Sequence, residues 1–254
     1  MLYLQEAGDK ENPALLFLHG GGLSSKQWQP QFERLSGAFY CLAPDLPEQG
    51  QSAAVGRFTL EDSVRHVTEI LGEKVPGQKA HIIGLSLGGA LTLALLRAAP
   101  QMVDHALVTG TSAGLGAFLG WLTINSTWMY KLFPQNMLLD MAVRQFGVPA
   151  QYREEFRQDL INGMKAEFTQ HFTRALMQLQ LPEAGKLLVC VGAKETLVAQ
   201  HDARKLARTI RGARGVRVPD VGHVWNLEAP ELFSITVRAW VSDKPLPAVL
   251  QPLV

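Results

Sequence analysis

Short apolar runs and amphipathic stretches alternate along almost the whole chain, and this alternation restricts the fold more than any other feature of the sequence. The apolar runs are bounded by Gly, Pro or Asp and have the length of buried strands; they cover residues 15–18, 39–43, 81–83, 106–109, 187–191 and 216–218. Helix-like stretches lie between them, over residues 25–35, 60–71, 87–99, 200–210 and 231–241. This alternation predicts an α/β fold with a mostly parallel central sheet and helices on both faces.

One region interrupts the alternation. Between about residues 113 and 181 we find no convincing strand pattern. Apolar residues instead follow helical spacing in two stripes: Phe156, Leu160 and Met164, and then Phe168, Phe172, Leu176 and Leu179. We therefore predict a core formed by residues 1–112 and 182–254, with an inserted helical cap over residues 113–181.

The predicted cap is rich in aromatic residues and carries few charges near its start, which favours a lid over an apolar pocket. The side chains expected to bind substrate are those of Trp121, Trp128, Phe133, Phe168 and Phe172. We expect no fixed cation in this pocket. If the pocket instead holds anionic substrates, an arginine such as Arg144 or Arg174 must face it.

Charge and cysteine content exclude several classes of protein. The 254 residues include 24 Lys+Arg and 23 Asp+Glu, and no basic stripe suggests a nucleic-acid partner. Cys41 and Cys190 lie in apolar strand-like runs and are expected to be buried thiols.

No export signal is apparent, and glycines interrupt the charge-free window over residues 106–130. We expect a cytoplasmic monomer or homodimer that does not bind membranes.

A serine lies between a strand-like run and a helix-like run. Residues 84–89 read Gly-Leu-Ser-Leu-Gly-Gly, with strand-like residues 81–83 before them and helix-forming residues 90–96 after them. A G-x-S-x-G nucleophile elbow requires this order of strand, turn and helix. Glycines flank the serine because the turn brings backbone against backbone, and the helix amino terminus directs partial positive charge at the site. We therefore predict that Ser86 is a nucleophile.

A serine hydroxyl needs a base that takes its proton during attack. Of the seven histidines, His223 lies in a short loop after the last strand-like run, where an α/β chain returns to the carboxyl edge of the sheet. We predict that His223 is the base. His171, on one of the cap stripes, is a weaker candidate for lining the pocket.

The base in turn needs a carboxylate that fixes its tautomer and stabilises the imidazolium. Glu195 follows the strand-like run 187–191 and is the predicted acid. Asp202 is the second candidate, but it is expected in the first turn of the next helix, where an acid is favourable in any case. The order Ser86, Glu195, His223 is nucleophile, acid and base along the chain.

Acyl transfer also needs hydrogen-bond donors for the developing oxyanion. Residues 19–22, His-Gly-Gly-Gly, directly follow the first strand-like run, and a glycine run leaves its N–H groups unobstructed. We predict the N–H groups of Gly21 and Leu87 as the donor pair. Gly22 is a possible substitute for Gly21.

These segments together resemble the α/β-hydrolase superfamily over nearly the whole chain. The matching residues are 18–22, 44–52, the serine turn, and 222–223 followed by 228–230. The resemblance implies a triad of serine, acid and histidine beneath a cap, without a metal or an organic cofactor. Three features depart from the usual pattern: Gln49 replaces a histidine, the acid is glutamate instead of the more common aspartate, and an incomplete opening strand pair is expected.

A second motif is typical of a different class of protein. Residues 109–116 match the T-G-x-x-x-G-x-G loop of short-chain dehydrogenases, which bind a dinucleotide. That fold would begin with the strand before this loop, and no Tyr-x-x-x-Lys occurs in the chain. We therefore do not expect NAD(P), and read the small residues as the turn from the sheet into the cap.

The leading functional hypothesis is hydrolysis of an ester or lactone of a small, largely apolar substrate through an acyl-enzyme. The same triad supports carbon–carbon bond hydrolysis, cofactor-free peroxidation and lyase chemistry, because the fold does not decide the function. A small-molecule sensor with little turnover is the alternative from a different class.

Overall fold

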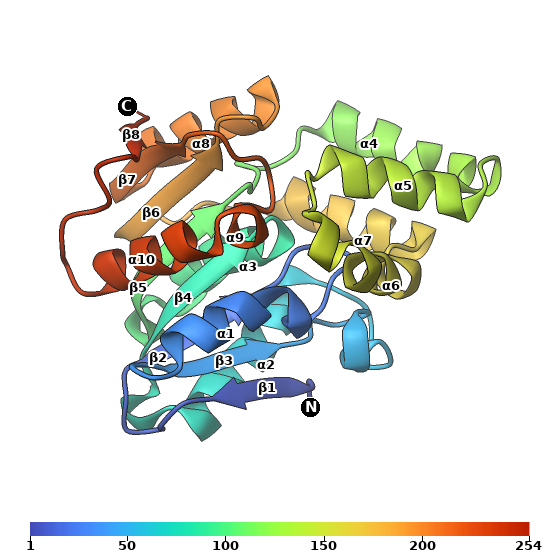
Figure 1. Cartoon of the computed structure of the whole chain (residues 1–254). Helices are drawn as coiled ribbons and strands as arrows, with labels where there is room; N and C mark the ends of the chain where they lie inside the picture. Colours follow the sequence, from blue (N-terminus) through green and yellow to red (C-terminus); the bar gives the residue numbers. More distant parts are fainter. Residues whose placement is uncertain (254) are drawn as a thin grey trace.

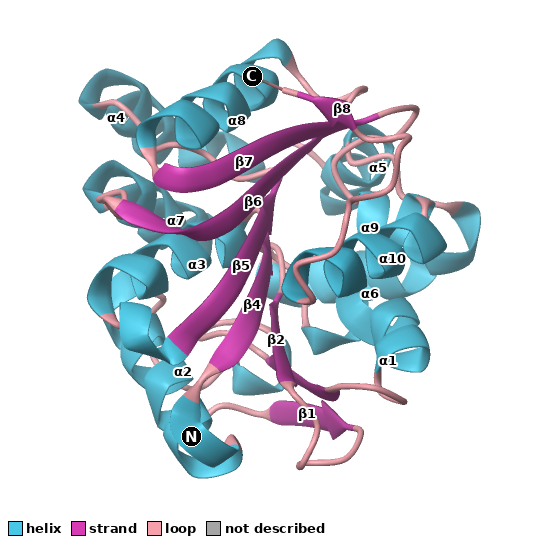
Figure 2. Cartoon of the chain, turned by 90° about the vertical axis from the view of Figure 1, so that its left-hand side faces the viewer, coloured by secondary structure: helices cyan, strands magenta, loops and turns pink. Residues whose placement is uncertain are grey.

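The computed structural model describes residues 1–253, and for Tyr130 and Lys131 it describes the backbone alone. Within this part of the chain, eight strands form one sheet in the order β1-β3-β2-β4-β5-β6-β7-β8 (Figures 1 and 2). The strands are β1 (Leu4–Ala7), β2 (Ala14–Leu18), β3 (Tyr40–Pro44), β4 (Ala80–Leu85), β5 (Val103–Thr109), β6 (Ala184–Gly192), β7 (Arg211–Val218) and β8 (Gln251–Pro252). The six central strands pair in parallel, which confirms the predicted α/β fold.

An incomplete opening strand pair was expected, and one short strand, β1, precedes β2, while the edge strand β8 was not predicted. β1 pairs antiparallel with β3, and β8 pairs antiparallel with β7. β1 has four residues and β8 has two, and neither contains a continuous apolar run. An edge strand with exposed side chains lacks the pattern by which the buried strands are recognised.

Helices cover both faces of the sheet (Figure 2). The core helices are α1 (Gln29–Leu35), α2 (Leu60–Lys74), α3 (Leu87–Ala98), α8 (Leu197–Thr209), α9 (Trp225–Glu228) and α10 (Pro230–Val241). α2, α3 and α8 pack on one face, and α1, α9 and α10 pack on the other. α8 begins at Leu197, so Asp202 lies in its second turn and not in the first, as the sequence had suggested.

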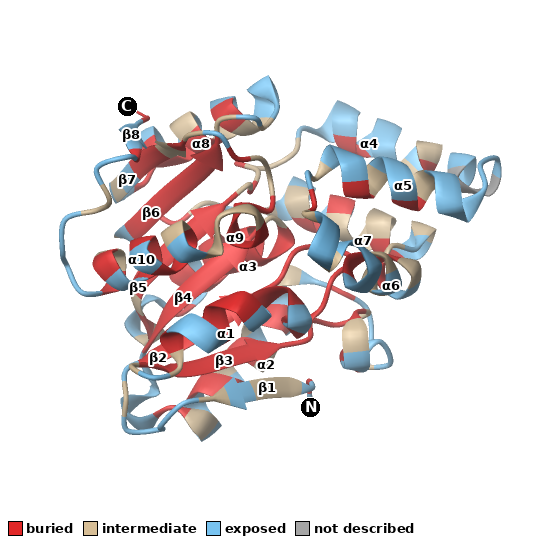
Figure 3. Ribbon diagram, in the orientation of Figure 1, coloured by how far each residue is buried: buried red, intermediate tan, exposed pale blue. Residues whose placement is uncertain are grey.

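Strand β2 contributes side chains to the hydrophobic cores on both faces of the sheet. Leu16 and Leu18 belong to one core, while Leu15 and Phe17 belong to the other, because successive strand residues point to opposite faces. All four side chains are fully buried (Figure 3). Each contributes roughly 1.5–3 kcal/mol relative to an exposed position, so this short strand fixes the middle of the sheet.

Four helices lie between β5 and β6. They are α4 (Ala117–Ser126), α5 (Gln135–Gln145), α6 (Arg153–Gly163) and α7 (Ala166–Gln178), and Figure 1 shows them together on one side of the sheet. We call residues 110–183 the helical insertion. α6 and α7 reach the glycine turn after β2, since Leu160 and Phe168 lie against Gly22 and Gly21. None of the helices described here is long and apolar enough to cross a bilayer.

Candidate active site

Ser86 occupies a strained turn between β4 and α3. Its φ of 55° and ψ of −111° lie in a region that residues with a Cβ rarely adopt. A Cβ on Gly84 would lie 2.3 Å from the carbonyl oxygen of Gly88, and one on Gly88 would lie 2.0 Å from that of Leu18. The two glycines of the motif are therefore required by backbone contact, as predicted from the strand-turn-helix pattern.

The ends of two neighbouring strands hold this serine in place. The N–H of Ser86 donates to the carbonyl of Thr109 at 2.9 Å, and the hydroxyl of Thr111 donates to the carbonyl of Ser86 at 2.9 Å. Gly110, between these two threonines, has a φ of +58°. A Cβ there would lie 2.6 Å from Cε1 of His223. The structure thus brings Ser86 and His223 against the same three-residue segment.

The predicted acid and base are directly paired. Oε2 of Glu195 lies 2.8 Å from Nδ1 of His223, and Oε1 of Glu195 accepts the N–H of Gly192 at 3.0 Å. The glutamate side chain is only 4% exposed and that of His223 is 19% exposed. A carboxylate fixed in this way holds the proton on Nδ1 and leaves Nε2 free to exchange a proton.

Ser86 and His223 are both described, and no hydrogen bond joins the serine hydroxyl to the imidazole. In enzymes without bound substrate, such bonds are often long and tighten when the substrate binds. Ser86, His223 and Glu195 could therefore pass a proton along, although the serine hydroxyl is not hydrogen-bonded to the imidazole in this structure.

Asp202, the second candidate acid, has other partners. Its Oδ2 accepts the hydroxyl of Ser112 at 2.9 Å and the N–H of Ala113 at 3.2 Å. The carboxylate therefore fixes the chain where it leaves β5 for the helical insertion. It makes no contact with His223 among the hydrogen bonds of the described residues.

In the glycine turn after β2, the N–H groups differ in whether they already have a hydrogen-bond acceptor. The N–H of Gly22 donates to Oε1 of Gln49 at 2.7 Å, so Gly22 is a poor substitute donor. Among the described residues, the N–H groups of Gly21 and Leu87 have no acceptor. Gln49, which stands where the superfamily usually has histidine, is completely buried and orients this turn.

His19 also stabilises the glycine turn after β2. Its Nδ1–H donates to the carbonyl of Gly20 at 2.8 Å, and its Nε2 accepts the N–H of Leu46 at 2.9 Å. Burial lowers the pKa of His19, which keeps the ring neutral and able to accept at Nε2. A neutral histidine with both nitrogens engaged is a structural residue.

The helical insertion contributes one aromatic ring that the sequence did not single out. Phe146 stacks on the imidazole of His223, with the ring centroids 5.2 Å apart and the planes at 28°. Glu228 also stabilises the loop of His223, because its Oε1 accepts the N–H of Gly222 at 2.8 Å. Burial raises the pKa of Glu228, although this hydrogen bond acts in the opposite direction. Spacing alone gives no signal for either contact, because both depend on the tertiary fold.

The aromatic residues predicted to bind substrate separate into two groups. Phe168 is 2% exposed, stacks with Phe172 at 6.1 Å, and lies against Gly21. The remaining three are largely solvent-exposed: Trp121 (59%), Trp128 (59%) and Phe133 (41%). The structure therefore brings only the two α7 phenylalanines toward the glycine turn.

A cavity of about 420 Å³ borders the Glu195–His223 pair. Arg144 and Lys194 both line it, together with Phe146. The expectation of no fixed cation concerned the apolar pocket under the cap, and it stays a prediction, because neither Ser86 nor Phe168 lines this cavity. Arg144, one of the two arginines named from the sequence for this case, is the one that lines the cavity.

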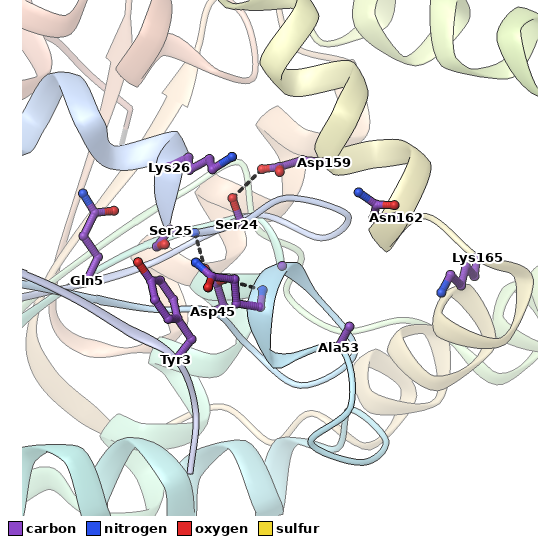
Figure 4. A pocket seen from close by; sticks show the side chains of 12 residues that line it. Tyr3, Gln5, Ser24, Ser25, Lys26, Asp45, Ala53, Asp159, Asn162 and Lys165 are labelled. Carbon is purple, nitrogen blue, oxygen red and sulfur yellow. Dashed lines mark hydrogen bonds between the residues drawn. The ribbon is translucent and has the colours of Figure 1, made fainter.

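A second cleft, of about 500 Å³, lies where α6 meets the core (Figure 4). Ser24 donates its hydroxyl to Oδ2 of Asp159 at 2.5 Å, and Asp45 accepts the N–H groups of Ser25 and Gln51 at 2.7 Å each. Its lining is polar and does not include Ser86. This cleft marks the boundary between helical insertion and core, away from the serine turn.

Comparison with known proteins agrees with this geometry. A model of the Alpha/beta hydrolase family matches residues 15–234. The chain belongs to the α/β-hydrolase family. It is 27% identical over 263 residues to carboxylesterase YbfK of Bacillus subtilis (strain 168), covering 92% of this chain and 82% of that protein.

Solved structures give the same result. The chain is 25% identical to a hydrolase from Pseudomonas aeruginosa PA01, with a TM-score of 0.78 over 94% of this chain and 93% of the other. It also superposes on the enol-lactonase from Burkholderia xenovorans LB400, with a TM-score of 0.79, 21% identity, and coverage of 95% and 96%. The protein is therefore a hydrolase of the α/β-hydrolase family.

Proposed function

We propose that the protein is a serine hydrolase that cleaves esters or lactones through an acyl-enzyme. The observation that carries this proposal is the strained turn at Ser86 beside the buried Glu195–His223 pair, with Gly110 in contact with that pair. The similarity to a carboxylesterase supports ester chemistry.

In the first half of the reaction, Oγ of Ser86 attacks the carbonyl carbon while Nε2 of His223 takes the hydroxyl proton. The N–H groups of Gly21 and Leu87 stabilise the oxyanion that forms. His223 then gives its proton to the leaving oxygen as the bond from carbon to that oxygen breaks, which leaves an acyl-serine. Removing one such oxyanion donor typically costs about 10²–10³ in turnover.

In the second half, water replaces the alcohol. His223 takes a proton from water, the hydroxide oxygen attacks the acyl carbon, and the bond to Ser86 breaks as the serine regains its proton. Glu195 stabilises the imidazolium in both halves. The residues named here carry every proton that moves, so the mechanism uses no metal or organic cofactor.

We further propose that the helical insertion is a cap that selects the substrate. Phe168 and Phe172 would contact the acyl group, because Phe168 lies against Gly21. The leaving group must lie beside His223, which protonates it. The cavity lined by Arg144 and Lys194 also borders His223, although its lining does not include Ser86. A short apolar acyl group with a polar or anionic leaving group fits this arrangement.

A panel of chromogenic esters with increasing acyl length tests the proposal. Each buried methylene is worth ~0.8 kcal/mol, or about a fourfold gain in kcat/KM, until the acyl site is full. We expect activity to rise and then fall with acyl length, with the optimum moved by Phe172→Ala. Trp121→Ala is the matched control and should leave the optimum in place. Absence of hydrolysis across the panel, with tight binding of the same esters, would instead favour a sensor.

A further inference from the structure

A second polar cluster lies at the other edge of the sheet, where β4 and β5 begin. His81, Asp104 and His105 each offer one nitrogen or oxygen atom, and these three atoms all lie within 4.8 Å of one another. We call these residues the amino-edge cluster. The pairing register of β4 on β5 shifts at this point. Consecutive strand residues normally point to opposite faces, and the shift allows Asp104 and His105 to gather beside the same histidine.

Both histidines of the amino-edge cluster contain a buried nitrogen without a partner. His81 is 9% exposed and His105 is 3% exposed, and Nδ1 of each has no hydrogen-bond partner among the described residues. A buried polar atom that makes no hydrogen bond destabilises the folded protein. Two such atoms beside one carboxylate point to a ligand that interacts with all three residues.

The tautomer of His105 is set by its other nitrogen. Nε2 lies 3.1 Å from Oδ1 of Asp243. When the Nε2–H donates to this carboxylate, Nδ1 carries the lone pair. That atom lies 3.3 Å from Oδ1 of Asp104. Metal-binding histidines usually donate their second nitrogen to a carboxylate in this way.

The second histidine is suited to the same role. The ring of His81 is buried, and Nδ1 is its atom without a hydrogen bond, so this atom is placed to offer a lone pair. Its ring centroid lies 5.3 Å from that of His105. Neutral imidazole is the form of histidine that ligates metals.

We propose that the amino-edge cluster binds a divalent transition-metal ion of the zinc class. Two imidazole nitrogens and one carboxylate oxygen are a donor set that Zn²⁺ prefers, and a water molecule would complete a tetrahedral site. Mg²⁺ and Ca²⁺ favour oxygen ligands and should bind poorly.

Two lysines lie near the amino-edge cluster. Nζ of Lys79 is 3.7 Å from Oδ1 of Asp104, and Nζ of Lys186 is 3.4 Å from Nε2 of His105. Their side chains are about half exposed, at 50% and 56%. Both ammonium groups can therefore turn into solvent when a cation binds between the histidines.

The site would stabilise the fold and take no part in ester cleavage. His81 lies near the start of β4 and Ser86 directly follows its end, which separates them by roughly 16 Å at ~3.3 Å per residue. The ion would join the first residues of β4 and β5. Through His105 and Asp243 it would also fix the chain where α10 ends.

Metal-free protein, prepared by treatment with a chelator, tests this inference when it is titrated with Zn²⁺ and, separately, with Mg²⁺. We expect one Zn²⁺ per chain by calorimetry. The midpoint of thermal unfolding should rise by about 5–10 °C when free Zn²⁺ is a hundredfold above its Kd. Mg²⁺ should produce no shift.

Three variants assign the binding to these residues. Asp104→Asn keeps the side-chain shape and should weaken Zn²⁺ binding at least tenfold, and His81→Gln should do the same. His66→Gln removes a partly buried histidine outside the amino-edge cluster, whose Nδ1 lies 3.2 Å from Glu69, and should leave both the affinity and the thermal shift unchanged. The proposal is overturned if the unaltered protein shows no Zn²⁺-dependent shift, or if Asp104→Asn binds Zn²⁺ as tightly as it does.

Discussion

Two glutamate–histidine pairs with nearly the same geometry lie in different parts of this molecule. Oε2 of Glu195 is 2.8 Å from Nδ1 of His223, and Oε2 of Glu48 is 2.9 Å from Nδ1 of His171. The first pair borders the segment that holds the strained serine turn. The second joins the loop after β3 to α7, and its carboxylate also accepts the N–H of Phe58 at 2.7 Å.

The comparison shows that a carboxylate–histidine pair does not by itself make a catalytic site. Around Glu195 and His223, a backbone turn aims a hydroxyl outward and two N–H groups lack acceptors. Glu48 accepts the N–H of Phe58, much as Glu195 accepts that of Gly192, but the pair of Glu48 and His171 connects the helical insertion to the core. The first pair is suited to moving protons, while the second is suited to holding two parts of the chain together.

Removing the nucleophile should give the largest difference between the two regions. Ser86→Ala should lower turnover by about 10⁶, as the loss of a triad serine does in a protease, and should leave the fold intact. Steady-state ester hydrolysis measures the loss, and a serine-directed phosphonate should label the unaltered protein at this residue. Ser112→Ala, a hydroxyl that bonds Asp202, is the control. Near-normal activity of Ser86→Ala would refute the mechanism.

Substitution of Glu195 and Glu48 tests directly whether only the first glutamate–histidine pair supports catalysis. Glu195→Gln should lower kcat by about 10⁴, because a neutral amide supports neither the correct tautomer nor the imidazolium. Glu48→Gln should change kcat less than tenfold, since its histidine only connects the helical insertion to the core. Asp202→Asn should also have little effect on the rate. A larger loss for Asp202→Asn than for Glu195→Gln would move the acid to Asp202.

A smaller effect should appear at the cavity beside His223. Arg144→Glu reverses a charge on its lining and should lower kcat/KM about fivefold for esters with a carboxylate in the leaving group, since an exposed charge pair is worth up to ~1 kcal/mol. Neutral leaving groups should be unaffected. Arg174→Glu reverses the charge of an α7 residue that does not line this cavity and is the control. Equal losses on neutral and anionic esters would argue against a leaving-group role.

The smallest effect concerns the boundary between helical insertion and core. Burial raises the pKa of Asp159, whose carboxylate accepts the hydroxyl of Ser24. Because the folded protein holds this proton to higher pH than the unfolded chain does, ionisation reduces stability as pH rises through the raised pKa. Asp159→Asn should therefore slightly raise the urea midpoint at pH 7 and leave it unchanged near pH 3. The exposed Glu155→Gln on the same helix is the control. A lower midpoint at pH 7 would mean that the charge itself stabilises α6.

Much of the core was predictable because buried parallel strands carry a strong pattern. Continuous apolar runs identified the six central strands, and the rule that functional residues follow the carboxyl ends of such strands directed attention to Ser86, Glu195 and His223. In the sheet, β4, β5, β6 and β7 are neighbours in this order, an order that was not predicted from the sequence.

The contacts around these residues could not be predicted. Gly110 belonged to a dinucleotide-like motif, and its contact with His223 follows from a positive φ that the sequence does not show. The engagement of Gly22 by Gln49 depends on two loops that are 27 residues apart. Glu48 has a φ of 67°, a conformation for which glycine would have been the expected residue.

The helical insertion was harder to interpret residue by residue. A helical stripe indicates which side of a helix is apolar, and this was sufficient for Phe168 on α7. α4 is apolar around most of its circumference, so spacing could not indicate which of its residues face solvent. For this reason Trp121 was expected near the substrate, although its side chain is mostly exposed.

The placement of the helical insertion also has a consequence for chain entropy. β5 and β6 are neighbours in the sheet, so residues 110–183 form a loop whose ends the sheet already holds together. The entropy of closing a loop grows only with the logarithm of its length, at about 0.6 kcal/mol per doubling. Relative to a crossover of ~20 residues, this loop is nearly two doublings longer and costs only about 1 kcal/mol more to close. The entropy of loop closure therefore places little limit on the length of the segment that would select the substrate.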